Sequence, residues 1–523
     1  MIQLQRSFLA RSKAIGFGPL LESWTRDDLR RFTNGIASQE TLSAQALERS
    51  SSFEPSMRQT LCEVLKAQYA KASSTIPENL DELLNPHSVT ITTGHQLSVA
   101  LGPLFTVFKI LHVVQLCEAM NESGAANTFL PVFWLASEDH DLEEVQNLHV
   151  FNKSFTWVPN ETGPVGSMTT GQLRPCYDEI LACFQGNSAL ELSELFQINA
   201  TNYALHYHQM LSKIFGKFGV ILIDGNDPTL KKAFSPLVRK ELREQFVMAT
   251  ASATNAELVD AGKKVQAHVR PINLFYLSPQ KRERIVPDEG HFVVGEQRWT
   301  LENMLTELEK HPERFSPNVL MRPLYQETVL PNVCSVGGSG ELNYWSQLKA
   351  TFKAAALPFP LLKTRISGFL LTASSAENDE AAFRSLTEQE HTLLSQASNR
   401  DPFFETLDLR LKALSDALME GIQPFGKEAE KWALPQIKAM ESALEHYQSR
   451  WQKQEKQNLE SELSRLRRKH AEKYPKDLPQ ERVTSLFQYC GGERPSELIL
   501  ALKNLIDPFS EELHIFEQSH ETE

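Results

Sequence analysis

The sequence predicts an α/β protein with a doubly wound parallel sheet and a long helical arm. Three short apolar runs, at 88–92, 131–136 and 219–223, are rich in β-branched and aromatic residues, and helix-compatible segments follow them. Strands that alternate with helices are typical of βαβ units, whose strands pair in parallel. Between 407 and 466, apolar residues instead recur every three or four positions. This second pattern predicts long helices.

The first strand and helix are predicted from residues 88–114. The β-branched run Ser88–Thr92 ends at Thr93-Gly94. Pro103 suits the first turn of a helix, because the missing proline N–H costs nothing there. Apolar residues then repeat at helical spacing, at Leu104, Val107, Phe108, Leu111 and Val114. This spacing predicts a helix with one face on the core.

Residues 97–116 are mostly apolar and about as long as a membrane span. They contain Lys109 and His112, and charge in the middle of a span is costly in lipid. We therefore expect a buried helix and no membrane association.

The domain organisation follows from changes in pattern along the chain. Residues 1–375 are predicted to form N-terminal helices and the sheet core, with polar insertions near 150–205 and 240–318. Residues 376–475 are predicted to form the helical arm. Residues 476–523 return to mixed composition, and we expect them to pack back on the core.

Within the arm, apolar residues step by three and four from Ile437 to Trp451, and again from Leu407 to Leu418. The polar gap at 452–458 shifts the register, as an inserted stutter does. The pattern favours an antiparallel coiled-coil pair, with packing in a helical bundle as the alternative. Either arrangement offers a platform for a homodimer.

Composition excludes several classes of function. The formal net charge is −13, whereas proteins that follow nucleic-acid backbones normally carry a basic face. Nucleic acid is therefore not an expected partner, although a few local basic residues suffice for a small anionic substrate. The six cysteines form no C-x-x-C pair and no secretory signal is visible. We expect reduced thiols and a cytoplasmic location.

The first candidate site follows the strand at 88–92 and consists of Gly94, His95 and Gln96. Ligands of open α/β sheets bind at the carboxyl ends of the strands. A glycine there allows close backbone approach, and the His and Gln side chains can donate hydrogen bonds to anionic oxygens. The alternative interpretation is a turn with a surface histidine.

The second candidate site follows the strand at 131–136 and consists of Glu138, Asp139, His140 and Asp141. Carboxylates and an imidazole at a strand end can hold an ammonium group, act as a base, or bind a hard cation. The alternative is a helix start, where acidic residues are favoured. A permanent zinc site is not expected, because the usual Cys or spaced second His ligands are missing.

The third candidate site is a glycine turn between a predicted strand and helix. Its backbone N–H groups could hold a phosphate or carboxylate. Arg322 and Gln326 make the neighbourhood polar, and Arg365 could bind an anion with its guanidinium fork. For Arg365 the alternative is a surface salt bridge. The turn consists of Gly337, Gly338, Ser339 and Gly340.

Four ordered motifs together resemble one family. They are TTGHQLSVALGPLFTVFKILHVVQL, PVFWLASEDHDLEEV, RPLYQETVLPN with VGGSGELNYWSQLK, and the late LPQERV. The chain resembles the cysteine ligases of bacillithiol biosynthesis, the BshC family. The resemblance implies a Rossmann-type core with connecting-peptide insertions, and a coiled-coil domain that mediates dimerisation. It also implies a reaction that joins L-cysteine to the amine of glucosaminyl malate.

Amide formation needs an activated carboxylate, and we expect ATP, with Mg²⁺ as a companion ion, to provide it, either as a cysteinyl adenylate or as an acyl phosphate. The Gly94–Gln96 turn and the Gly337–Gly340 loop would contact phosphate. The acidic cluster would hold or deprotonate the amine, and Arg322 and Arg365 would bind a carboxylate. The alternative is a dimeric scaffold that binds a nucleotide or thiol metabolite without turnover. The enzyme hypothesis requires all three loops to meet in one polar pocket.

Overall fold

The computed structural model describes residues 2–18, 23–372, 380–398 and 402–518. They belong to two units. The core unit consists of residues 1–11, 17–376 and 480–523, and the arm unit of residues 12–16 and 377–479. The core unit therefore includes sequence from both sides of the arm.

A five-stranded, all-parallel sheet forms the centre of the core unit, with the order β14-β13-β2-β3-β6. The three apolar runs predicted as strands lie in β2, β3 and β6, so the predicted α/β fold class is confirmed. The chain runs outward from β2 to β6 and then returns to the other side of β2. The strand order therefore reverses between β2 and β13, and such a switch point is where open α/β sheets bind ligands. The strands are β2 (Ser88–His95), β3 (Thr128–Leu135), β6 (Ile221–Asp224), β13 (Asn332–Gly337) and β14 (Leu361–Thr364).

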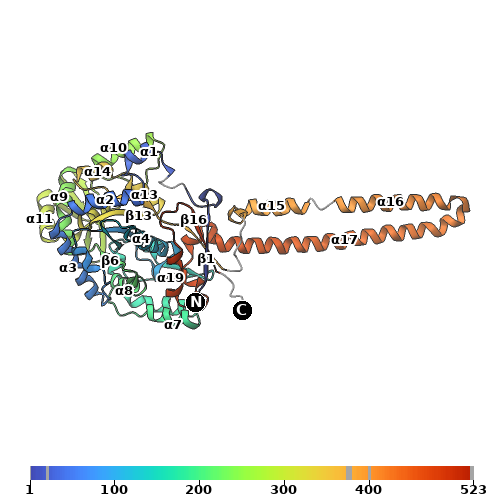
Figure 1. Ribbon diagram of the computed structural model, residues 1–523, viewed down its shortest axis with the longest axis horizontal. Helices are drawn as coiled ribbons and strands as arrows, with labels where there is room; N and C mark the ends of the chain where they lie inside the picture. The colour runs from blue at the N-terminus through green and yellow to red at the C-terminus, as the bar shows by residue number, and fades with distance from the viewer. Residues whose placement is uncertain (1, 19–22, 373–379, 399–401, 519–523) are drawn as a thin grey trace. The chain divides into compact units, whose positions relative to one another are not determined.

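Helices cover this sheet (Figure 1). Helix α4 (Leu104–Glu122) packs on β2 and β3, and α2 (Gln39–Ser52) packs on β2 and β13. Both contribute to one apolar cluster with Val89 and Ile91 of β2. Helix α4 is long and apolar enough to cross a membrane, but most of it is buried in the protein. It is the core helix that the sequence predicted.

The polar stretches between the central strands form small elements of their own. Strands β7 (Leu274–Ser278), β8 (Lys281–Arg284) and β12 (Phe315–Pro317) make one sheet. A second contains β9 (Val286–Asp288), β10 (His291–Val294) and β11 (Gln297–Thr300), and β4 (Asn147–Val150) pairs with β5 (Lys153–Thr156). The longer helices of these stretches and their neighbours are α6 (Leu173–Leu181), α7 (Gly186–Leu195), α8 (Tyr203–Phe215), α9 (Pro228–Glu244), α10 (Phe246–Asp260) and α11 (Leu301–Lys310).

Both ends of the chain join the core unit through a three-stranded sheet. Strand β16 (Leu513–Gln518) pairs antiparallel with β1 (Leu4–Leu9) and parallel with β15 (Gly368–Leu371). Helices α18 (Gln480–Val483) and α19 (Pro495–Leu505) both contact α4. The segment after the arm is therefore built into the same body as the central sheet.

The arm unit contains α15 (Leu386–Ser398), α16 (Pro402–Ile422) and α17 (Gly426–Lys473). Helices α15 and α16 lie along α17, as Figure 1 shows. Gln448 of α17 donates to Asp408 of α16 at 3.2 Å, and Arg467 donates to Glu390 of α15 at 2.6 Å. Later residues of α17 thus meet earlier residues of the other two helices. This is the antiparallel arrangement that the sequence predicts.

Candidate functional site

A cavity of about 900 Å³ lies beyond the carboxyl ends of β2, β3, β13 and β14 in the core unit. It sits at the switch point between β2 and β13, where the order of the sheet reverses. All three predicted loops reach it. The predicted residues in its wall are Gly94, His95, Gln96, Glu138, Asp139, Arg322, Gln326, Gly337, Gly338, Ser339, Gly340 and Arg365.

His140 and Asp141 do not line the cavity, although the sequence analysis grouped them with the catalytic candidates. Both are exposed. Asp141 is the residue before the short helix α5 (Leu142–Val145), whose Glu144 lines the cavity and accepts from Gln96 Nε2 at 2.9 Å. The backbone N–H of His140 donates to Asp139 Oδ1 at 2.8 Å, so His140 still helps to fix its neighbour. Four consecutive ionisable residues therefore do not form one cluster.

Asp139 lies at the centre of the acidic segment. Its Oδ2 accepts a hydrogen bond from Gln96 Nε2 at 2.6 Å, which joins the loops after β2 and β3. Arg282 Nη1, from β8, lies 3.6 Å from its other oxygen. Glu138, in contrast, is paired with the buried ammonium group of Lys231. Asp139 is therefore the better placed of the two carboxylates to act on a bound amine.

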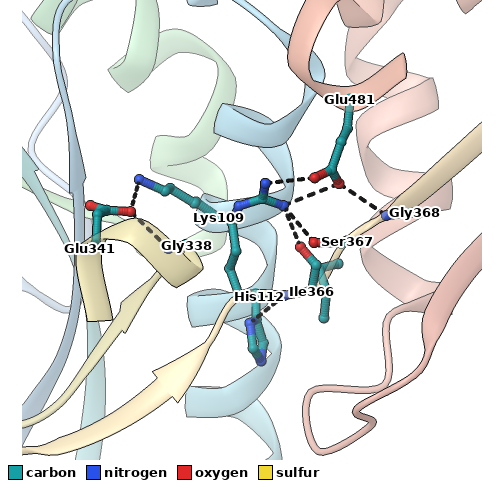
Figure 2. A network of polar contacts seen from close by, with 9 residues as sticks. Lys109, His112, Gly338, Glu341, Ile366, Ser367, Gly368 and Glu481 are labelled. Carbon is teal, nitrogen blue, oxygen red and sulfur yellow. Dashed lines mark hydrogen bonds and ion pairs between the residues drawn. The ribbon is translucent and has the colours of Figure 1, made fainter. Parts of the chain in front are cut away.

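Lys109 and Glu341 form an ion pair that was not expected from the sequence (Figure 2). Lys109 is buried in α4, and its Nζ lies 2.6 Å from Glu341 Oε2 and 3.1 Å from the carbonyl oxygen of Gly94. Burial alone would raise the pKa of Glu341, but the charge and hydrogen bond of Lys109 hold it below its ordinary value. The available signal was a single lysine in an apolar helix. This lysine indicated only that the helix does not span a membrane.

The same carboxylate caps the glycine turn. Gly338 N–H donates to Glu341 Oε2 at 2.8 Å, at the start of α13 (Ser339–Trp345). Glu341 therefore already occupies one of the N–H groups that the sequence analysis assigned to a phosphate. Within the described residues, the backbone N–H groups of Ser339 and Gly340 have no acceptor, and both residues line the cavity. The turn can still bind an anionic oxygen through these two groups.

Arg365 forms a buried salt bridge, where the sequence analysis considered a ligand fork or a surface ion pair. Its Nη2 and Nη1 lie 2.6 Å and 3.1 Å from the two oxygens of Glu481 (Figure 2). Glu481 also accepts from the backbone N–H of Gly368 at 3.0 Å. The Arg365 and Glu481 side chains are 5% and 1% exposed. Arg365 thus lines the cavity with a guanidinium group that an internal carboxylate already holds.

Two histidines near this network are neutral. Burial, with the nearby charge of Lys109, lowers the pKa of His95 to about 3. Burial also lowers the pKa of His112 to about 3. The Nδ1 atom of His112 accepts from Ile366 N–H at 3.1 Å, and its Nε2 lies 2.8 Å from the carbonyl oxygen of Pro508. His112 therefore joins the segments that contain Ile366 and Pro508. His95 lines the cavity with an uncharged imidazole.

The insertion around β7 and β8 adds cationic residues that the sequence analysis missed. Arg282 and Arg284 flank the ring of Phe275, with their guanidinium carbons 4.1 Å and 4.9 Å from its centre. Among the described residues, seven basic and four acidic side chains line the cavity, in a protein of net charge −13. The basic ones are Lys109, Arg270, Arg282, Arg284, Arg322, Arg365 and Arg482. This excess of positive charge fits an anionic ligand.

A glycine at position 94 is required by packing against β3. A Cβ atom there would lie 2.9 Å from the carbonyl oxygen of Trp134 and 3.0 Å from its Cβ. We expect Gly94→Ala to lower the free energy of unfolding of the core unit by about 1–3 kcal/mol, because the backbone of β3 would have to move. Denaturant unfolding measures this change. Gly340→Ala is the matched control, since a Cβ there meets open space. Equal losses from both changes would contradict the prediction.

Glu327 of α12 (Arg322–Val329) lies beneath the cavity wall and is fully buried. Its Oε1 accepts from Gln326 Nε2 at 2.9 Å and from Asn332 Nδ2 at 2.7 Å. Burial raises its pKa from 4.5 to about 7, against the opposing charge of Arg49. The folded state therefore holds this proton more tightly than the unfolded chain. The resulting stabilisation is complete below pH 4.5 and is lost as the pH rises through 7.

We expect Glu327→Gln to remove this pH dependence. The stability of the variant relative to the parent should rise by on the order of 3 kcal/mol between pH 4.5 and pH 8. Urea unfolding at several pH values measures the difference, with the exposed Glu48→Gln of α2 as control. A constant difference across this range would show that folding does not raise the pKa of Glu327.

The fold and the cavity define a Rossmann-like α/β protein with a cation-rich site at the switch point of its sheet and a separate coiled-coil unit. Residues 25–366 match the family described as "Bacillithiol biosynthesis BshC, N-terminal Rossmann-like domain", and residues 374–518 match its C-terminal coiled-coil domain. The chain belongs to the BshC family.

Three relatives are similar to this chain over most of their length. A protein of Christiangramia forsetii is 32% identical over 95% of this chain and 96% of its own. Proteins of Flavobacterium johnsoniae (30%, 95% and 97%) and Cytophaga hutchinsonii (33%, 88% and 89%) are similar to the same degree. All three bear the name "Putative cysteine ligase BshC".

Proposed function

We propose that this protein is a ligase that joins the carboxyl group of L-cysteine to the amine of glucosaminyl malate, with bacillithiol as the product. Its family and the names of its relatives support a cysteine ligase rather than a scaffold without turnover. The observation that carries the proposal is the cation-rich cavity at the switch point of the sheet. Malate contributes two carboxylates, so its glycoside suits such a cavity.

The acidic residues of the cavity suit the amine. A sugar amine is largely protonated at neutral pH and must lose a proton before it attacks a carbonyl carbon. Asp139 is held by Gln96 and by the backbone N–H of His140, which fixes the direction of its oxygens. In the proposed reaction it binds the ammonium group and accepts its proton. Glu138 remains paired with Lys231 and keeps the neighbouring loop in place.

The basic residues of the cavity suit the carboxylates. Arg322 of α12 lines the cavity, and one of its nitrogens donates to Gln326 Oε1 at 2.9 Å. Arg270 and Arg284 line the wall contributed by the insertion. We assign the malate carboxylates to these arginines. Arg365 is paired with Glu481 and stabilises the cavity wall. We therefore do not assign a substrate carboxylate to its guanidinium group.

The proposal includes ATP as the co-substrate that activates the cysteine carboxyl. The carboxylate forms either an adenylate, with release of pyrophosphate, or an acyl phosphate, with release of ADP. Attack by the amine then forms the amide bond and releases AMP or phosphate. The cavity fits a polyphosphate, because the N–H groups of Ser339 and Gly340 are available beside cationic side chains. Within the described residues, no group of three His, Cys, Asp or Glu side chains is placed to hold a metal ion. A Mg²⁺ ion that accompanies ATP would take most of its ligands from phosphate oxygens and water, with at most one or two carboxylates of the cavity.

The test is a ligation assay with purified protein, L-cysteine and glucosaminyl malate, with and without ATP, followed by mass spectrometry of the thiols. The proposal predicts a product with the mass of the amide, formed only when ATP is present. Product formation at the same rate without any nucleotide would refute the activation scheme and leave the ligase assignment intact. Absence of product with ATP and Mg²⁺ would count against the ligase itself.

We also propose a cytoplasmic homodimer formed through the arm. The cytoplasmic location is supported by the cysteines: all six lie in described residues and are free thiols, five of them buried. The paired helices of the arm leave large apolar side chains exposed, among them Leu414, Trp432 and Trp451. A second copy of the arm would cover them. Light scattering of the parent protein and of Trp432→Glu tests this, and a monomeric parent would overturn it.

A further inference from the structure

The segment that follows the arm in sequence is built firmly into the core unit. Gln480 pairs with both backbone groups of Leu370 in β15, accepting from its N–H at 2.7 Å and donating to its carbonyl oxygen at 3.0 Å. Glu481 holds Arg365 and the backbone N–H of Gly368. Both side chains are buried. The position of α18 is therefore set by polar interactions with β15 and with Arg365, which lines the cavity.

Arg482 is the next residue of α18, and its side chain does not point into the protein interior as that of Glu481 does. Successive residues of a helix are turned by about 100° from each other, so Arg482 is exposed while Glu481 is buried. Arg482 lines the main cavity. It also lines a smaller hollow together with Gly338, Ser339 and Arg365. Within the described part of the chain, its guanidinium group has no hydrogen-bond or ion-pair partner.

We infer that Arg482 is an anion-binding residue of the active cavity, which receives a carboxylate or phosphate group of a substrate beside the Gly338–Ser339 turn. The inference rests on the proposed function and assigns a role to the LPQERV motif. In this motif Gln480 and Glu481 fix the position of α18. The fixed helix then holds the Arg482 side chain at the cavity. An arginine without an internal partner on a rigid support can form two parallel hydrogen bonds to one anionic group.

Calorimetric titration with glucosaminyl malate and with ATP, each alone, tests the inference without any turnover. We expect Arg482→Ala to weaken the binding of one of the two by about 10- to 100-fold, because charge-assisted hydrogen bonds are lost. Arg482→Lys should restore part of the loss. Weaker binding of glucosaminyl malate would identify the anion as a carboxylate, and weaker binding of ATP would identify it as a phosphate.

The matched control is Arg494→Ala, which removes an exposed arginine at the start of α19 that does not line the cavity. The inference is overturned if Arg482→Ala binds both ligands within twofold of the parent. It is also overturned if both weaken equally and the melting temperature falls, as a structural role would produce. If the parent makes no product but Arg482→Ala loses ligand binding, the inference stands and the ligase proposal fails.

Discussion

Replacing Asp139 with asparagine is expected to lower kcat/KM for amide formation by at least about 100-fold, the usual contribution of a positioned general base. The amide cannot accept the proton of the substrate amine. It keeps the size of the side chain and one oxygen acceptor for Gln96, so the loops after β2 and β3 remain in place. Steady-state kinetics with mass-spectrometric detection of the product measures the effect.

Asp141→Asn is the control for this experiment. Asp141 is only two residues away in sequence, but it is exposed and outside the cavity. Its replacement should leave kcat/KM within about twofold of the parent value. Equal losses from the two variants would mean that the acidic segment acts as one cluster. Full activity of Asp139→Asn would remove this residue from the mechanism.

The second large effect is expected on stability. Glu481→Gln should lower the free energy of unfolding of the core unit by about 3 kcal/mol, because it leaves the buried guanidinium of Arg365 without its counter-charge. Urea unfolding followed by circular dichroism measures the change. Replacing both partners, as in Arg365→Leu with Glu481→Met, should recover much of the loss, since no buried charge then remains.

The exposed pair Arg174–Asp178 provides a matched control. Its side chains are 66% and 54% exposed, so Asp178→Asn should change the free energy of unfolding by no more than about 0.5 kcal/mol. If Glu481→Gln had an effect equally small, the Arg365–Glu481 pair would not hold α18 against the cavity. The positioning of Arg482 would then need another explanation.

Most of the cavity could be predicted from local sequence, for a simple reason. The carboxyl ends of parallel strands lie on the same edge of a sheet, so polar residues that directly follow such strands must meet there. This brought His95, Asp139 and Gly338 together. The rule failed for His140 and Asp141, whose side chains are exposed, although Glu144 of the following helix α5 lines the cavity.

The residues that complete the site are distant in sequence, and no local pattern placed them at the cavity, although Glu481 and Arg482 belong to the LPQERV motif. Arg282 and Arg284 come from an insertion, and Glu481 and Arg482 follow a 48-residue helix of the other unit. Periodicity cannot place a polar residue that depends on contacts more than 100 positions away. Lys109 was visible as an isolated charge in an apolar helix, but its partner Glu341 lies 232 positions later.

The sequence by itself determined the order of strands and helices, the parallel sheet, the antiparallel arm and the loops that line the cavity. These features depend on patterns of two to seven residues, which local sterics and burial decide. Only the tertiary structure decided which charges are neutralised internally and which face the cavity. Glu138, Arg365 and Glu341 have partners, whereas Arg482 has none among the described residues. The reason is physical: a charge is buried only with a partner, and folding alone brings the partners together.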